Sequence, residues 1–227
     1  MKKSDLNKKR SRKTGSGGLL IPGISGPEGL VKYPDTVIEN LIDILSKPTQ
    51  VLTTDKYLES MAKRQEAVNR HLIRGGADTL RRLFELIRQR EEKGEPIKLD
   101  LSMLDISSKV LSGLYLPGAN LEKLVITGSD ITGANLMAAN LKAAIANSTI
   151  MREVIATGAD FTDAVLPHAD LSGARLIGCT FVNTIMTDVI VDRNTNFAGS
   201  RFVGTYFGGT DISQANLTGA TFRGIRR

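Results

Sequence analysis

The sequence contains no tryptophan, a single cysteine and few aromatic residues. Aromatic side chains make up 5% of its 227 residues, so a core built around large rings is not expected. The one thiol, Cys179, cannot form an internal disulfide and stands at a small-residue position, which favours a reducing, cytoplasmic compartment. No apolar run is long enough for a signal peptide, or for the roughly 20 residues that span a bilayer. We therefore expect a soluble protein.

Positive charge is unevenly distributed along the chain. The formal net charge is +6, with 20 Lys or Arg against 13 Asp or Glu in residues 1–98 and 10 against 11 in residues 99–227. Most of the excess lies in the opening segment MKKSDLNKKRSRKTGSGG, where Asp5 is the only acid. A segment of this composition cannot bury apolar surface, so we expect it to be disordered on its own.

The first part of the chain is predicted to contain an arm and three helices. Pro22, Pro27 and Pro34 exclude a continuous helix from the segment after the basic run, so residues 1–34 form a basic, extended N-terminal arm. Three amphipathic helices follow within residues 35–98. The first is expected to be capped by Asp35 or Thr36, with a Thr36 to Glu39 capping box, and to end before Pro48; the second covers about 55–74, and the third runs from Asp78 towards Gly94.

From Leu99 onward, large apolar residues recur at every fifth position. This period matches neither an α-helix, at 3.6, nor a flat strand, at 2. The pattern makes 25 consecutive units, with one inserted residue near Asp192, and glycine takes the last place of 12 of them, where a turning chain benefits from its freedom. Four aromatic residues are spaced 20, 21 and 20 apart and are expected to stack: Phe161, Phe181, Phe202 and Phe222.

These units resemble those of the pentapeptide repeat proteins. ANLEK, SDITG, ADFTD, ADLSG and ANLTG fit the family's A(D/N)LXX pattern in phase across residues 99–224. The resemblance implies a mainly β fold for residues 99–227, a right-handed quadrilateral β-helix of about six coils. In that fold the large residue and the small residue two places before it point inward, and the other three side chains of each unit face water. The helical domain over residues 35–98 would cap the first coil.

Catalytic and metal-binding patterns are missing from the sequence. The two histidines, His71 and His168, are isolated, and Cys179 occupies an inward position where a thiolate would be poorly solvated. No phosphate-binding loop, nucleophile elbow or zinc pattern is present. We therefore predict no enzyme, no cofactor and no metal. Acidic residues at the outer polar position of the repeat are not expected to converge: Asp100, Asp105, Asp130, Asp160, Asp170 and Asp211.

Two parts of the chain are candidate binding sites. The basic arm is expected to meet nucleic acid, an acidic protein surface or anionic lipid, through Lys2, Lys3, Lys8, Lys9, Arg10, Arg12 and Lys13. The C-terminal end of a solenoid needs a cap, and the segment RGIRR is too short to supply one. We therefore expect a second copy or another protein to cover that end, at Phe207, Phe222 and Ile225.

The predicted function is a non-enzymatic structural protein, a rigid rod tethered by its basic arm to a larger assembly. This layout suits a component of a virion or another particle. One alternative is binding to DNA gyrase or topoisomerase, as the quinolone-resistance members of the family do. Those members present a strongly acidic surface, whereas the repeats here are close to neutral. A second alternative is a secreted bacterial effector.

Overall fold

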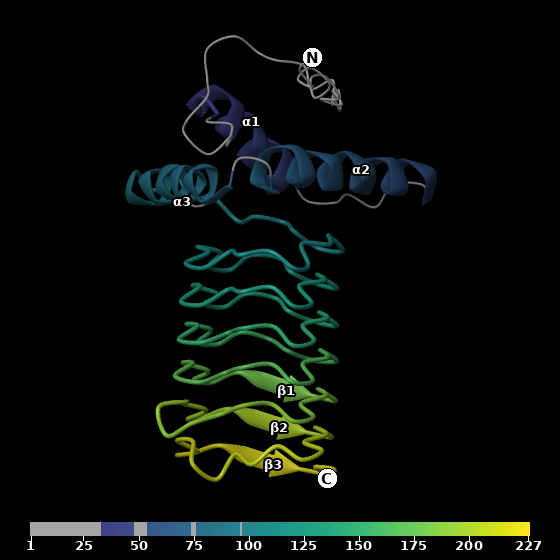
Figure 1. Cartoon of the computed structure of the whole chain (residues 1–227), viewed down its shortest axis with the longest axis vertical. Helices are drawn as coiled ribbons and strands as arrows, with labels where there is room; N and C mark the ends of the chain where they lie inside the picture. Colours follow the sequence, from purple (N-terminus) through teal and green to yellow (C-terminus); the bar gives the residue numbers. More distant parts are fainter. Residues whose placement is uncertain (1–32, 48–53, 74–75, 96) are drawn as a thin grey trace, which may run out of the picture.

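The computed structural model describes residues 33–47, 54–73, 76–95 and 97–227. All but the last two residues of the predicted arm lie outside them. The helices stand at one end of a stack of coils, and the chain ends at the other (Figure 1). Four helical segments precede the coils: α1 (Asp35–Ser46), α2 (Thr54–Ala67), a π-helical continuation η1 (Val68–Ile73) and α3 (Gly76–Glu92).

The three predicted helices are present, but the predicted cap of the first one is wrong. The N-cap of α1 is Pro34, which supplies no side-chain capping bond. The Asp35 carboxylate accepts a hydrogen bond from Arg82 Nε on α3, at 2.8 Å. Glu39, the expected partner in a capping box, accepts a hydrogen bond from Arg90 of α3 instead. Ion pairs between helices therefore replace the local caps, because α1 and α3 pack against each other.

The repeats form coils of twenty residues. Parallel bridges join each bridged residue to the one twenty positions later, as in Asp100↔Asn120 and Val125↔Ile145. The interval becomes 21 where a pair spans the predicted insertion, as in Arg175↔Asn196. With one bridge position in every five residues, each coil has four sides. Three short strands pair in parallel on one side: β1 (Thr180–Val182), β2 (Arg201–Val203) and β3 (Thr221–Arg223).

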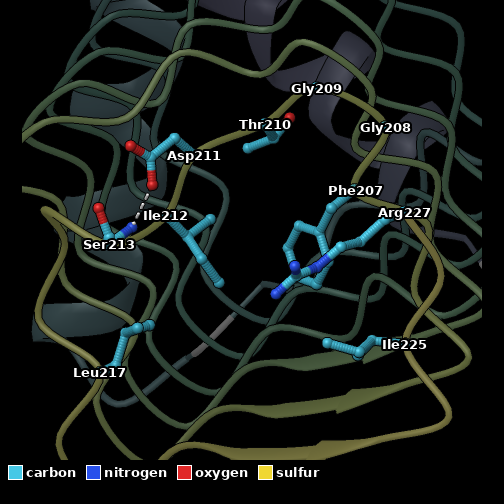
Figure 2. A pocket seen from close by; sticks show the side chains of 10 residues that line it. All are labelled: Phe207, Gly208, Gly209, Thr210, Asp211, Ile212, Ser213, Leu217, Ile225 and Arg227. Atoms are coloured by element: carbon cyan, nitrogen blue, oxygen red, sulfur yellow. Dashed lines mark hydrogen bonds between the residues drawn. The ribbon is translucent and has the colours of Figure 1, made fainter.

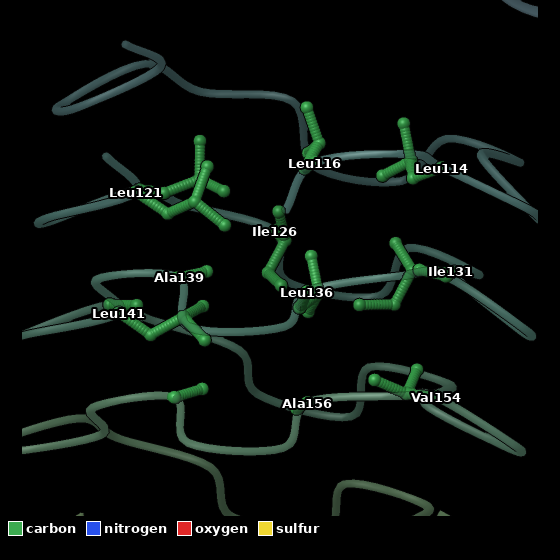
Figure 3. Close-up of a cluster of buried hydrophobic side chains, with 14 of the residues drawn as sticks. Leu114, Leu116, Leu121, Ile126, Ile131, Leu136, Ala139, Leu141, Val154 and Ala156 are labelled. Atoms are coloured by element: carbon green, nitrogen blue, oxygen red, sulfur yellow. The ribbon is translucent and has the colours of Figure 1, made fainter. Parts of the chain in front are cut away.

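The inside of the coils is filled by the two predicted side chains of each unit. Large residues such as Leu121, Leu136 and Leu141 are buried, as are small ones such as Ala139 (Figure 3). The prediction that the remaining side chains face water has exceptions, since Asp100, Ser102 and Asp170 are buried. Asp170 is covered because Arg152 Nε donates to its carboxylate at 2.5 Å and Ser172 Oγ donates to it at 2.6 Å.

The C-terminal coils are packed differently from the earlier ones. Phe161, Phe181, Phe202 and Phe222 stack as predicted, with successive centroids 5.0, 4.8 and 4.8 Å apart. The small inward positions of one coil are all hydroxyl residues, and each donates to a carbonyl oxygen of the preceding coil: Thr195, Ser200, Thr205 and Thr210. These hydrogen bonds satisfy polar groups that burial would otherwise leave without partners.

Most units end in a residue with positive φ. Glycine takes this place in Gly133, at φ 67°, but many units place a residue with a side chain there, such as Ala138 at φ 52° and Glu153 at φ 56°. The left-handed conformation is sterically costly for any residue with a Cβ. The positive φ at this place thus explains the predicted benefit of glycine. Units with another residue there carry backbone strain, which lowers the stability of the fold.

The helices contact the first coil directly. The Asp100 backbone N–H donates to the Leu45 carbonyl at 2.6 Å, and the Asp105 N–H donates to Gln65 Oε1 at 2.8 Å. Arg64 of α2 is buried, with 3% of its surface exposed. Its Nη1 contacts the carboxylate of Asp100 in the first coil at 3.1 Å. Apolar residues of the helices and of the coils belong to one continuous core. The segment boundaries at residues 34 and 98 stay a prediction.

Candidate interaction site

The open end of the last coil carries the predicted C-terminal residues. Phe222 and Ile225 are 40% and 38% exposed, whereas Phe207 is only 5% exposed because Phe202 packs against it, with ring centroids 5.5 Å apart. A pocket of about 550 Å³ opens here, with side chains around a hollow centre (Figure 2). Phe207 and Ile225 line it, and so do eight residues that were not predicted, among them Ile212, Leu217, Asp211 and Arg227.

The pocket could have been predicted more fully from the repeat itself. Ile212 and Leu217 are the large residues of two of the last described units, and no described residue forms a further coil over them. Both are only partly buried, whereas the equivalent residues of the middle coils are fully buried. The same period of five that predicts the core therefore marks these two residues as belonging to the exposed end.

Backbone groups at this end lack the partners that earlier coils provide. The N–H of a large inward residue normally donates to a carbonyl of the next coil, as Leu121 does to Asn140 at 2.7 Å. Within residues 97–227, which the structure describes without a gap, the N–H groups of Ile212 and Leu217 have no such acceptor. An edge of this kind is a template for pairing with another extended segment.

The end also carries a small positive cluster. Arg223, Arg226 and Arg227 are exposed, and Asp211 is the nearest acid in the last coil. Arg226 bends back to donate from Nη2 to the Gly204 carbonyl at 3.1 Å. The Asp211 carboxylate accepts the Ser213 backbone N–H at 2.9 Å, and this hydrogen bond lowers its pKa. The exposed guanidinium groups favour an acidic or carbonyl-rich partner surface.

The basic arm carries the other predicted binding site. All seven of its predicted contact residues lie outside the described residues, so their role stays a prediction. They are Lys2, Lys3, Lys8, Lys9, Arg10, Arg12 and Lys13.

The repeat aspartates hold turns together instead of forming an acid pair. Asp130 Oδ1 accepts the backbone N–H of Thr132 at 2.9 Å, and Asp160 accepts that of Thr162 at 2.9 Å. Hydrogen bonds from the side chain and backbone of Thr132 lower the pKa of Asp130. The same bond to the residue two places later is made by Asp100, Asp105, Asp170 and Asp211.

Among the described side chains, Cys179 and His168 show no reactive arrangement. Cys179 is buried, its Sγ donates to the Ala156 carbonyl at 2.9 Å, and burial raises the pKa of the thiol to about 12. His168 is exposed on the outer turn, with Nδ1 3.9 Å from Asp188. Of His71 only the backbone, within η1, is described. Among the described side chains, no three His, Cys, Asp or Glu residues come together to hold a metal ion.

Comparison with known families agrees with the twenty-residue coils. Residues 110–142, 157–190 and 193–226 match the family of pentapeptide repeats, with eight copies. The chain is a pentapeptide repeat protein. No curated protein matches the sequence significantly. None of the helices in the described residues of this pentapeptide repeat protein is both long enough and apolar enough to cross a bilayer.

Solved structures similar to this pentapeptide repeat protein include other members of the family. A pentapeptide repeat protein from the cyanobacterium Cyanothece 51142 is 18% identical, covers 63% of this chain and 97% of its own, and has a TM-score of 0.32. QnrB1, a plasmid-mediated fluoroquinolone resistance protein, is 21% identical over 56% of this chain and 76% of its own, with a TM-score of 0.25. HetL from Nostoc, involved in heterocyst differentiation regulation, is 18% identical over 62% and 92%, with a TM-score of 0.22.

Proposed function

We propose that this pentapeptide repeat protein is a non-enzymatic interaction protein whose C-terminal end binds another protein chain. The main support is the last coil, where Phe222 and Ile225 are exposed beside an apolar pocket and a free backbone edge. A solenoid whose terminal repeat exposes its core is prone to self-association unless something covers it. The bound chain would supply the cover that this end lacks.

In this proposal the two ends have different roles. The helices over residues 35–98 serve as the cap of the first coil, and contacts such as Arg64 to Asp100 support that role. The rod itself, a right-handed solenoid of about six coils, holds the C-terminal end at a fixed distance from the helices. With coils about 4.8 Å apart, that distance is on the order of 30 Å.

The C-terminal contact is tested with the full-length chain. We expect Phe222→Glu combined with Ile225→Glu to reduce association, measured as solution mass by light scattering and as loss of proteins that co-purify with the native complex. Val110→Glu is the matched control, because Val110 is 77% exposed on an early coil. A wild-type chain that is strictly monomeric, and whose co-purifying proteins are unchanged by the double variant, would sink the proposal.

The arm is proposed to tether the rod to an anionic partner. Seven basic residues stand within the first 13, and neutralising about six phosphates would make affinity fall roughly a thousandfold between 50 and 200 mM salt. Replacing the seven with glutamine in the full-length chain is expected to abolish this salt dependence. Salt-independent binding to DNA, RNA and anionic vesicles alike would contradict the tether.

Narrower assignments remain open to direct tests. None of the comparisons supports the prediction of a virion component. Binding to gyrase or topoisomerase would appear in a supercoiling assay, and we expect no inhibition, because the outer acids are interspersed with bases such as Lys142, 3.3 Å from Asp160. Export as an effector would appear as the protein in culture medium.

A further inference from the structure

One side of the solenoid presents an uninterrupted uncharged surface. Successive parallel bridges on this side join five apolar or aromatic residues, which we call the uncharged face. Ile145 and Tyr206 are 38% and 37% exposed, and the other three are partly exposed. The face consists of Val125, Ile145, Val165, Ile185 and Tyr206.

The other three sides do not share this property. Their bridge positions carry charges in the middle of the stack, such as Asp160 on one side, Asp170 on the next and Arg175 on the last. Apolar bridge positions are therefore not a requirement of the coil. The first turn residue after each bridge position is uncharged as well: Thr127, Asn147, Pro167, Thr187 and Gly208. The second turn residues include one charged side chain, Asp188, which lies 3.9 Å from His168.

Opposite charges stand at the two ends of the uncharged face. The same run of bridges begins at Asp105, beside the helices, and ends at Arg226, beside the C-terminus. Both side chains are exposed. Asp105 Oδ1 accepts the Ser107 N–H at 2.9 Å, and Arg226 is held on this side by its bond to Gly204. The face is thus an apolar strip with a negative and a positive terminus.

We propose that the uncharged face binds the same face of a second copy in an antiparallel pair, related by a two-fold axis. An antiparallel arrangement sets Asp105 opposite Arg226 of the partner subunit at both ends, whereas a parallel one sets like charges together. The run has seven members, so its central residue, Val165, lies on the two-fold axis. This proposal concerns the side of the rod and adds a self-interaction to the end contact proposed above.

The shape of the helical layer fits the antiparallel pair. Figure 1 shows α2 projecting beyond the coils on the side where the chain ends. Gln65 of α2 donates to the Asp105 carbonyl at 2.9 Å, so this helix crosses the first coil where the uncharged face begins. In the antiparallel pair, α2 of each copy lies next to the last coil of the other, where backbone groups are free.

The size of the face predicts a reversible dimer. Seven bridge positions spaced about 4.8 Å apart make a strip about 29 Å long and one side chain wide. This is smaller than the roughly 1,600 Å² that a stable interface usually buries. We therefore expect dimer and monomer to exchange with protein concentration in the micromolar range.

Sedimentation equilibrium of the full-length chain over a concentration series tests the pairing. We expect Val165→Lys to raise the dimer dissociation constant at least tenfold. Ile155→Lys is the matched control, since Ile155 is an equally half-buried bridge residue on another side, and it is expected to leave the constant unchanged. Circular dichroism verifies that both variants are folded. A monomer at all concentrations, or equal effects of the two variants, would overturn the proposal.

Cross-linking with a short bis-maleimide tests the orientation. Val165→Cys is expected to cross-link with itself across the two-fold axis, while Val125→Cys cross-links only when mixed with a Tyr206→Cys chain. Cys179 is buried and does not compete. Self-cross-linking of Val125→Cys would show a parallel pair and refute this arrangement. If Val165→Cys does not cross-link while Phe222→Glu with Ile225→Glu still abolishes partner binding, the pair is excluded and the proposed function stands.

Discussion

The two ends of the solenoid are built from the same repeat but are finished differently. At the first coil, α1 and α2 provide a carbonyl, a glutamine and a guanidinium to the coil's polar groups, and apolar residues such as Ile42 continue the core. At the last coil, the inward residues Ile212 and Leu217 are only partly covered and their N–H groups have no backbone acceptor.

The contrast shows that the repeat does not terminate itself. The backbone N–H and C=O groups of a coil find their hydrogen-bond partners in the neighbouring coils. The first and last coils therefore need partners that the repeat pattern cannot supply. Helices cover the first coil, whereas the last coil is exposed in the described residues. Each end can be perturbed separately, which makes the difference measurable.

Removing the buried guanidinium of Arg64 should give the largest loss of stability at the closed end, where the helices cover the first coil. Arg64 and Asp100 are 3% and 6% exposed, and Arg64 Nη2 also donates to the Lys47 carbonyl at 2.7 Å. Arg64→Ala leaves a buried carboxylate without its cation, which typically costs about 3–5 kcal/mol. We expect the helical signal in circular dichroism to be lost at a lower urea concentration than in the wild type.

The exposed pair between Arg82 and Asp35 provides the control for this change. Its side chains are 40% and 54% exposed, so Arg82→Ala should cost much less stability than Arg64→Ala. Equal urea midpoints for the Arg64 and Arg82 variants would show that the closed end does not depend on the buried pair.

Substitutions of two stacked phenylalanines compare the stability contributed by the interior of the coils with that contributed by the open end. Phe202 is fully buried and stacks on both Phe181 and Phe222, whereas Phe222 has only one ring against it. Phe202→Leu should therefore destabilise the solenoid by about 2 kcal/mol, through lost ring contacts and poorer packing. Phe222→Leu should cost less than about 1 kcal/mol. The measurement is the urea midpoint of the β signal, and a larger loss for Phe222 would mean that the end is covered in solution.

Much of this contrast is visible in the sequence. The period of five predicts which side chains are buried, the interval of 21 locates the insertion near Asp192, and the spacing of Phe161, Phe181, Phe202 and Phe222 predicts their stacking. These predictions hold because each repeat contacts only its neighbours, so a local pattern determines the local structure. The same count places Ile212, Leu217 and Phe222 in the last of the 25 units, which form the exposed end of the described coils.

The helical layer and the side surfaces are less accessible to this reasoning. Arg64 looks like one more surface residue of an amphipathic helix, and only the packing of α2 on the first coil brings it to Asp100. Asp35 and Glu39 look like caps but form ion pairs with α3. Such contacts join residues that are far apart in sequence and have no period. The residues of the uncharged face can be recognised in the sequence only when the twenty-residue length of the coil is known.

Substitutions in the middle coils, away from both ends, sharpen the comparison by measuring the coil alone. Gly133, at φ 67°, has nothing within 4 Å of where a Cβ would stand, so Gly133→Ala introduces only backbone strain. We expect a loss of about 1 kcal/mol. Ala138→Gly, at the same place of the next unit, should stabilise by about 0.5–1 kcal/mol. Urea midpoints that move in the same direction for both variants would contradict the role of positive φ.

The smallest expected effect concerns acid, and it tests whether the coils between the ends respond uniformly. Hydrogen bonds from Thr132 lower the pKa of Asp130 in the folded chain, so the stability it contributes is present above its unfolded pKa, near 4, and is lost as pH falls through the lower folded value. Asp130→Asn keeps the acceptor, as Asn140 does for the N–H of Lys142, and removes the titration. We expect a slightly lower melting temperature at neutral pH and a shallower fall in melting temperature below about pH 4. An Asp130→Asn chain with the melting temperature of the wild type at neutral pH and an equally steep acid fall would mean that the charge of Asp130 does not stabilise the coil.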